Sequence, residues 1–78
     1  MSAALLRVGQ LRRWTCSHPP VPSEWYDLTF MIVAKRLHWV DPRGVQHASI
    51  DILVDGQLDQ GWRDQDILTM SEVIDEEG

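Results

Sequence analysis

Two apolar runs flank a turn signal in residues 28–54, LTFMIVAKRLHWV-DPRG-VQHASIDILV. The β-branched and aromatic content of both runs favours strands over a buried helix. Pro42 presets the φ angle of the second turn position, Asp41 can accept hydrogen bonds from the backbone, and Gly44 suits the last position of a type I turn. The stretch therefore predicts a long β-hairpin around which the other segments pack.

Pairing Val40 with Val45 sets the expected register of this hairpin. The face expected to point inward then carries four apolar side chains of the first strand, namely Met31, Val33, Leu37 and Trp39. The opposite face places His38 beside His47 and is polar near the turn but apolar at its far end. That pattern fits a strongly bent sheet whose end is covered on both sides. A slip of one residue would exchange the two faces.

The segments on either side of the hairpin extend an all-β prediction. Residues 5–15 are expected to form a first strand, with Arg12 and Arg13 on opposite faces. Residues 16–27 form a long loop with three prolines, which exclude regular pairing. The loop is expected to end in a short helical turn capped by Ser23.

The C-terminal third is expected to complete a meander. Asp-Gly at 55–56 favours the positive φ angles of a tight hairpin turn. Residues 57–62 then form a strand, with Leu58 and Trp62 packing inward. Residues 63–67 are expected to form one 3-10 turn and residues 68–70 a last short strand. An acidic tail over 75–78 follows.

Length and composition limit the class of protein. Seventy-eight residues, 1–78, are expected to form a single small domain with a limited core. The one cysteine, Cys16, excludes an intrachain disulfide and favours a reducing compartment or stabilisation by partners. No run of about 20 apolar residues predicts a membrane span, and the N-terminus lacks the features of a signal peptide. A cytoplasmic or virion-associated protein is expected.

Charge is divided along the chain. The formal net charge is -5, which argues against a general nucleic-acid binder. Six of the seven basic residues lie at or before Arg43, whereas ten of the twelve acidic residues lie at or after Asp41. Such halves can complement each other inside one fold or between copies, so protein partners or self-association are expected.

Three segments together resemble small SH3-like β-barrel proteins found in phage and bacterial genomes. They are Val8 to Arg12, Ile50 to Gly56 and Trp62 to Ile74. In that pattern a Val-Gly first strand with a basic end is followed by a Val-rich strand ending in Asp-Gly. A tryptophan, a helical turn and a short closing strand come after it. The resemblance implies a five-stranded antiparallel barrel used in virion assembly or as a binding module, and it carries over no functional residues.

Catalytic and cofactor patterns are missing from the sequence. There is no Gly-rich phosphate loop, no nucleophile elbow and no HExxH motif. Cys16 and His18 supply two zinc ligand types, but zinc needs about four ligands. His38 and His47, as neighbours, could bind a metal or sense pH, although an exposed polar pair is favoured. The chain is predicted not to be an enzyme, with no cofactor, metal or catalytic residues.

Calcium is the other metal that the acidic residues suggest. The segment from Asp55 to Asp66 lacks the alternating oxygen ligands, central glycine and distal glutamate of a calcium loop. Turn and helix-cap roles are therefore favoured for its four aspartates.

Aromatic residues supply the main functional signal. Phe30 and Trp62 are assigned to the core. Because Trp and Tyr are enriched at binding hot spots, the other aromatics are candidate contacts, with core packing as the alternative. Exposed arginines could add a basic face suited to single-stranded nucleic acid. The predicted partner-binding residues are Trp25, Tyr26, Trp39, Arg12 and Arg36.

These observations predict a non-enzymatic structural or protein-interaction module. It is expected to be a small component of a larger assembly, of which a phage virion is one example. The alternative is a small barrel that binds nucleic acid, for which binding falls steeply with salt.

Overall fold

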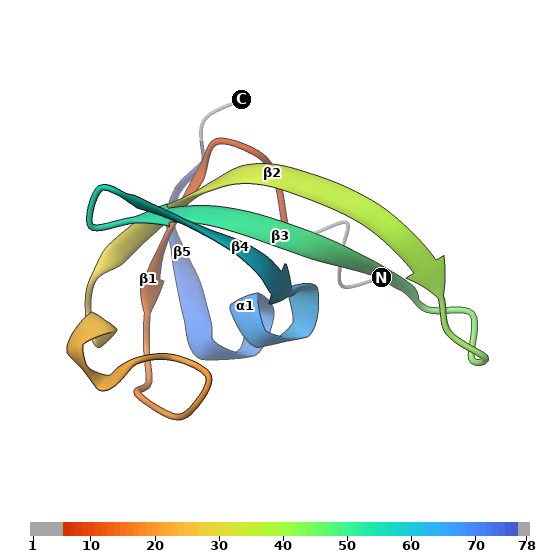
Figure 1. Ribbon diagram of the computed structural model, residues 1–78, viewed down its shortest axis with the longest axis horizontal. Helices are drawn as coiled ribbons and strands as arrows, with labels where there is room; N and C mark the ends of the chain where they lie inside the picture. The colour runs from red at the N-terminus through yellow and green to blue at the C-terminus, as the bar shows by residue number, and fades with distance from the viewer. Residues whose placement is uncertain (1–5, 77–78) are drawn as a thin grey trace.

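The computed structural model describes residues 6–76, apart from the side chains of residues 37–39 and 76. Within this range the chain forms five strands, one α-helix and one short 3-10 helix (Figure 1). In chain order these are β1 (Gln10–Trp14), η2 (Ser23–Trp25), β2 (Thr29–Val40), β3 (Gln46–Val54), β4 (Gln57–Arg63), α1 (Asp64–Met70) and β5 (Ser71–Glu76).

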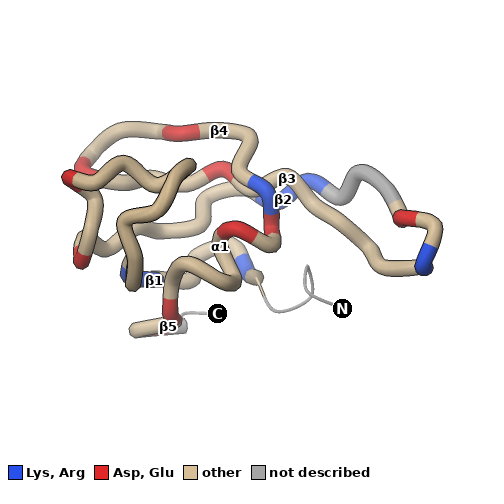
Figure 2. The backbone as a smooth tube through the Cα atoms, turned by 90° about the horizontal axis from the view of Figure 1, so that it is seen from below, with Lys and Arg blue, Asp and Glu red and all other residues tan. Residues whose placement is uncertain are grey.

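All five strands belong to one antiparallel sheet, in the order β4-β3-β2-β1-β5. The sheet bends strongly, and the β2–β3 hairpin extends well past α1 (Figures 1 and 2). The prediction of a mainly β fold with five antiparallel strands is thus confirmed. The sheet is not closed, because β4 and β5 are its two edges.

The core lies on the inner side of the bend, where α1 and the 16–27 loop cover the sheet. Trp14 is at its centre, with ring centroids 4.3 Å from Phe30 and 5.0 Å from Trp62. Offset aromatic contacts of this kind add to the stabilisation from burial itself. The buried apolar residues are Leu6, Trp14, Val21, Phe30, Ile32, Ala48, Ile50, Ile52, Val54, Trp62 and Ile67. The assignment of Phe30 and Trp62 to the core is confirmed.

Both predicted hairpin turns form where their residues indicate. The amide of Gly44 donates to the carbonyl of Asp41 at 2.9 Å, and Gly44 has a φ of +84°. The Asp41 side chain also accepts the amide of Val45 at 3.0 Å. Asp55 and Gly56, with φ of 51° and 76°, join β3 to β4 in two residues, as expected of a type I′ turn.

The register of the β2–β3 hairpin is as predicted in its middle and shifted by one residue at both ends. Arg36 lies opposite Ser49, as expected. A bulge between residues 32 and 34 then places Met31 opposite Leu53, and a second bulge between residues 37 and 39 places residue 39 opposite His47. The predicted pairing of His38 with His47 is therefore wrong, and the side chain of His38 lies outside the described residues.

The first of these bulges exchanges the faces at the start of β2. Met31, expected to point inward, is 37% exposed, while Ile32 is fully buried. An extra residue in one strand reverses the alternation beyond it. The inward assignment of Met31 was wrong for this reason. Val33 lies in the bulge itself and is half-buried.

The segment after β4 also differs from its prediction. Residues 64–70 form one α-helix instead of a 3-10 turn followed by a strand. Ile67 and Met70, one turn apart, both face the core, which is the spacing of an amphipathic helix. The closing strand is β5, which pairs with β1 and includes Asp75 and Glu76 of the expected tail. Residues 77–78 of that tail lie outside the described range.

The 3-10 helix of the long loop forms as expected, but its cap does not. Pro22 occupies the N-cap position of η2, and no side chain caps it. The first strand is also shorter than predicted, because β1 begins at Gln10 after Gly9, which has a φ of 91°.

Candidate interaction surfaces

Arg12 is inside the fold. Its side chain points inward from β1 and the residue is 4% exposed, whereas Arg13 is half-exposed on the opposite face. The expectation of one arginine on each face is therefore confirmed. The Arg12 guanidinium donates to Ser71 Oγ at 2.7 Å, to the Ser71 carbonyl at 3.0 Å and to Gln10 Oε1 at 2.9 Å. Burial lowers the pKa of Arg12. This residue joins β1 to β5 and leaves no exposed face for a partner.

Arg36 is on the outer side of β2 and pairs with a buried carboxylate. Its Nη2 lies 2.7 Å from Oδ2 of Asp51, whose side chain is only 4% exposed against 55% for Arg36. The other oxygen of Asp51 accepts the amide of Gly61 at 3.1 Å. A buried carboxylate needs such partners, since an unpaired charge there is strongly destabilising. Arg36 therefore ties β2, β3 and β4 together, while half of its side chain remains accessible.

Other cations of the predicted basic face also have partners inside the chain. Arg13 bonds to Glu72, which raises the pKa of Arg13, and lies 3.6 Å from Asp27. Lys35 Nζ donates to the carbonyl of Leu6 at 3.0 Å. A phosphate backbone would have to compete with these contacts.

The predicted aromatic contacts are divided between core and surface. Trp25 is partly buried, with its ring centroid 6.0 Å from Trp14 and 6.1 Å from Trp62. Tyr26, the next residue, is 58% exposed. The side chain of Trp39 lies outside the described residues. The long loop is thus anchored through one aromatic ring and presents the other to solvent.

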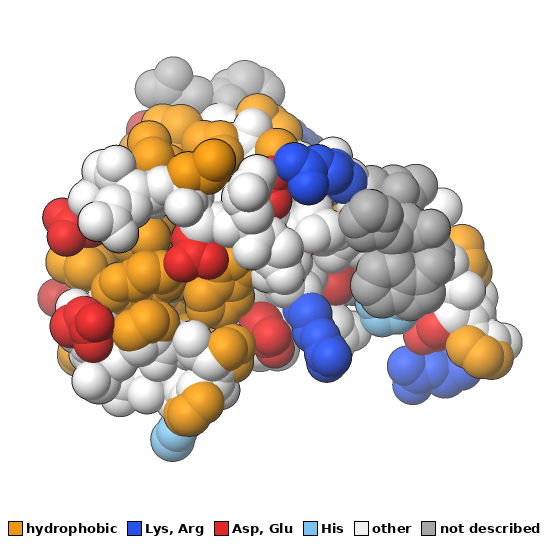
Figure 3. All heavy atoms as spheres, in the orientation of Figure 1, with side chains coloured by type: hydrophobic (Ala, Val, Ile, Leu, Met, Phe, Trp, Pro, Cys, Tyr) orange, Lys and Arg blue, Asp and Glu red, His pale blue; other side chains and the backbone are white. Residues whose placement is uncertain are grey.

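An open groove of about 350 Å³ lies beside this loop, between β4 and α1. Its lining residues are Pro20, Gln60, Gly61, Trp62, Arg63 and Asp66. Oδ1 of Asp59 accepts the indole Nε1–H of Trp62 at 3.1 Å, which places a second carboxylate near the groove. Figure 3 faces this region and shows hydrophobic side chains surrounded by acidic ones.

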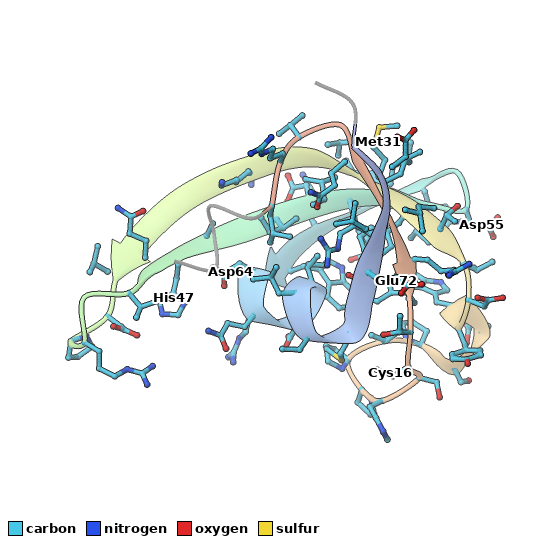
Figure 4. The ribbon with its side chains drawn as sticks, turned by 180° about the vertical axis from the view of Figure 1, so that it is seen from behind. Cys16, Met31, His47, Asp55, Asp64 and Glu72 are labelled. Carbon is cyan, nitrogen blue, oxygen red and sulfur yellow. The ribbon has the colours of Figure 1, made fainter. Side chains whose placement is uncertain are left out.

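His47 lies between two carboxylates where the long hairpin approaches the start of α1. Its Nε2 is 3.0 Å from Oδ2 of Asp41, and its Nδ1 is 3.7 Å from Oδ1 of Asp64 (Figure 4). The hydrogen bond from His47, followed by the one from the amide of Val45, holds the pKa of Asp41 well below its usual range. Asp64 is buried and accepts the amides of Ala48 and Gln65.

The other proposed metal ligands are on the molecular surface. Cys16 is half-buried and its thiol is free, and His18 is exposed. Among the described side chains, no group of three or more His, Cys, Asp or Glu is arranged to hold a metal ion.

Sequence reasoning missed an apolar row on the outer face of the sheet. Leu11 pairs with Met31, Met31 with Leu53, and Leu53 with Leu58, so four strands contribute one side chain each. Leu58, expected to pack inward, is 57% exposed. The two-residue turn at 55–56 was the available signal, because it fixes Leu53 opposite Leu58.

The chain matches no protein-family model, and comparisons with curated proteins and with solved structures found no significant similarity. No helix within the described range is long and apolar enough to cross a membrane.

Proposed function

We propose that this protein is a non-enzymatic interaction module that binds an extended, positively charged segment of another protein. The binding site is the groove beside Trp62. The observation that carries the proposal is the groove itself: an open depression with an indole in its lining and carboxylates at its edge.

Charge complementarity selects the partner. Asp66 lines the groove, Asp59 contacts the indole of Trp62, and the chain has a formal net charge of -5. A lysine or arginine of the partner gains attraction from these carboxylates and from the indole of Trp62. Arg63, also in the lining, disfavours a uniformly cationic segment, so cationic residues alternating with apolar ones fit best.

The architecture supports placing the module among SH3-like folds. The strand order β4-β3-β2-β1-β5, a strongly bent sheet and a helix between β4 and β5 agree with the pattern in the sequence. On this proposal the protein is a small component of a larger assembly, and components of a virion are partners to examine first.

The experiment is a titration of ¹⁵N-labelled protein with two synthetic decapeptides. One alternates arginine with proline and leucine, and the other replaces each arginine with glutamate. The indole Nε1–H of Trp62 and the amide of Gly61 are expected to shift saturably with the first peptide only. Shifts with both peptides, or with neither at millimolar concentration, would refute the proposal.

Variants locate the site. Asp66→Asn is expected to weaken binding about fivefold, the effect of losing about 1 kcal/mol. Asp55→Asn, at the far turn, is the matched control and should leave binding unchanged. Equal losses in Asp66→Asn and Asp55→Asn would mean that only net charge matters.

Nucleic acid is the competing ligand, and the same titration tests it. An oligodeoxythymidine should leave the Trp62 and Gly61 signals unmoved. Binding of that oligonucleotide with a steep salt dependence, lost in Arg36→Gln, would replace the protein partner with single-stranded nucleic acid.

A further inference from the structure

The groove beside Trp62 lies along a free edge of the sheet. Its lining includes four consecutive residues of β4, from Gln60 to Arg63. Only β3 pairs with β4, which is the first strand in the order β4-β3-β2-β1-β5 and runs along one side of the molecule in Figure 2. An edge strand presents backbone N–H and C=O groups to which another strand can bond. A site for side chains of a partner and a site for its backbone therefore lie next to each other.

The turn at 55–56 determines which backbone groups of β4 face outward. A two-residue turn is closed by a hydrogen-bonded pair, which here consists of Val54 and Gln57. Hydrogen-bonded and non-hydrogen-bonded pairs alternate along antiparallel strands, so Leu53 and Leu58 form a non-hydrogen-bonded pair. The amide and the carbonyl of Leu58 consequently point away from β3, toward the position that an additional strand would occupy.

The two faces of β4 differ in chemistry along this edge. Asp59 pairs with the buried Ile52, so its side chain lies on the inner face of the sheet. Trp62 pairs with the buried Ile50 and lies on the same face, where its indole donates to Asp59. Leu58 is on the outer face and is 57% exposed. A strand added to this edge would meet a carboxylate and an indole on one face and a leucine on the other.

We propose that the partner segment binds as a sixth strand, antiparallel to β4 and hydrogen-bonded to its free edge. This inference rests on the proposed function and specifies how the same site binds its ligand. In this mode of recognition main-chain hydrogen bonds provide affinity, and alternate side chains provide specificity. Antiparallel addition continues the pattern of the sheet, in which each pair of neighbouring strands is antiparallel.

The alternation of side chains along a strand defines the sequence of the partner. Side chains on the inner face meet Asp59 and Asp66, so cationic residues belong there. Side chains on the outer face lie beside Leu58, so apolar residues belong there. In an antiparallel pair the residue opposite Leu58 bonds to it, so the apolar residues carry the amides that face β4. A proline at an apolar position would lose that bond, so the reference peptide for the test alternates arginine with leucine only.

The other edge strand of the sheet is β5. Val73 and Ile74 are exposed there, but among the described residues none of β5 lines the groove. Between its turn and the bulge at Gly61, β4 also lacks the lysine and proline residues that commonly protect an edge. The one charged residue in that part of β4 is Asp59, which is bonded to the indole of Trp62. The edge beside the groove is therefore the one suited to an extended segment.

Backbone methylation of the peptide tests the added strand. A decapeptide that alternates arginine with leucine is titrated into the ¹⁵N-labelled full chain, and the indole signal of Trp62 reports binding. Methylation of two leucine amides is expected to raise the dissociation constant at least about tenfold, because each methyl group removes a donor that faces β4. Methylation of two arginine amides is the matched control and should change the constant less than about twofold. Equal effects of the two methylations, or a larger effect at arginine, would overturn the proposal.

Hydrogen exchange of the protein provides a second measurement that needs no modified peptide. On saturation with the arginine–leucine peptide, the amide of Leu58 is expected to exchange at least about tenfold more slowly, because it becomes a donor to the added strand. The amides of β5 are the control and should exchange at unchanged rates. An unchanged rate at Leu58, or slower exchange in β5 instead, would overturn the proposal.

The outcomes separate the added strand from the groove on which it rests. Saturable binding of the arginine–leucine peptide that is insensitive to leucine methylation would leave the groove as the binding site and refute the added strand. If neither this peptide nor the one with prolines shifts the indole signal of Trp62, the groove proposal fails and the added strand fails with it.

Discussion

His47 Nε2 lies 3.0 Å from Oδ2 of Asp41, across the turn of the long hairpin. The same carboxylate accepts the amides of Arg43 and Val45 through Oδ1. One aspartate therefore fixes both the shape of the turn and the position of the histidine, which in turn lies near Asp64 at the start of α1.

This arrangement predicts a pH dependence of stability. The pKa of Asp41 is lowered in the folded chain, so its contribution is fully present above the unfolded pKa of about 4 and is lost as the pH falls below it. Asp41→Asn keeps an oxygen for the turn amides but removes the charge beside His47. Urea unfolding should show the wild type more stable than Asp41→Asn at pH 5.5, with the difference shrinking toward pH 2. A constant difference across that range would contradict the charge effect.

Because Asp51 is buried, we expect the removal of Arg36 alone to cost more stability than the removal of both charges of the pair. Arg36→Met leaves the buried Asp51 carboxylate without its cation and should lower the free energy of unfolding by about 2 kcal/mol. Adding Asp51→Asn should recover part of that loss, because the uncompensated charge is gone. Chemical denaturation of the single and double variants measures the coupling. Arg43→Met, which removes the exposed pair with Asp41, is the control and should change stability by less than about 1 kcal/mol.

Arg12 predicts a stability effect from a conservative change. Lysine cannot reproduce the three hydrogen bonds that the guanidinium makes to Ser71 and Gln10. Arg12→Lys should therefore lower the melting temperature, with a cost of about 2 kcal/mol. Arg13→Lys, on the exposed face, should be nearly neutral. Calorimetry of the two variants distinguishes them, and equal melting temperatures would argue against a structural role for Arg12.

Substituting Gly56 is expected to lower stability through backbone conformation alone. A Cβ at this position would meet no atom within 4 Å, but its φ of 76° lies in the left-handed region. Gly56→Ala should cost about 1 kcal/mol, and Gly56→Asn less, because asparagine tolerates that region. Equilibrium unfolding of the pair provides the measurement. A larger loss in Gly56→Asn than in Gly56→Ala would show that backbone strain is not the cause.

Features with local causes were predictable from the sequence. The turns at 41–44 and 55–56 follow from Asp, Pro and Gly at fixed positions, and the mainly β fold follows from the apolar runs. The bulge beside Val33 was not predictable, because no glycine or turn residue marks it within the apolar run. Residues 68–70 look like a strand in isolation but continue a helix, since Ile67 and Met70 face the core.

The candidate surfaces, like the fold, were predictable from the sequence only in part. Of the two adjacent aromatic candidates, Tyr26 is exposed and Trp25 packs against the core, and the sequence did not distinguish them. Arg12 and Arg13 had to lie on opposite faces, but which of them was buried depended on which face of β1 the rest of the chain covers. The apolar row required Met31 on the outer face, and one unforeseen bulge decided that.

The pairing of β1 with β5 has a consequence for synthesis on the ribosome. Strands β2, β3 and β4 are consecutive and can pair as hairpins as soon as they emerge from the ribosome. Residues 10–14, made first, acquire their second neighbour only when residues 71–76 are translated. Until then Arg12 has no serine hydroxyl to bond, and a nascent chain stalled before residue 71 carries a guanidinium without its main acceptor.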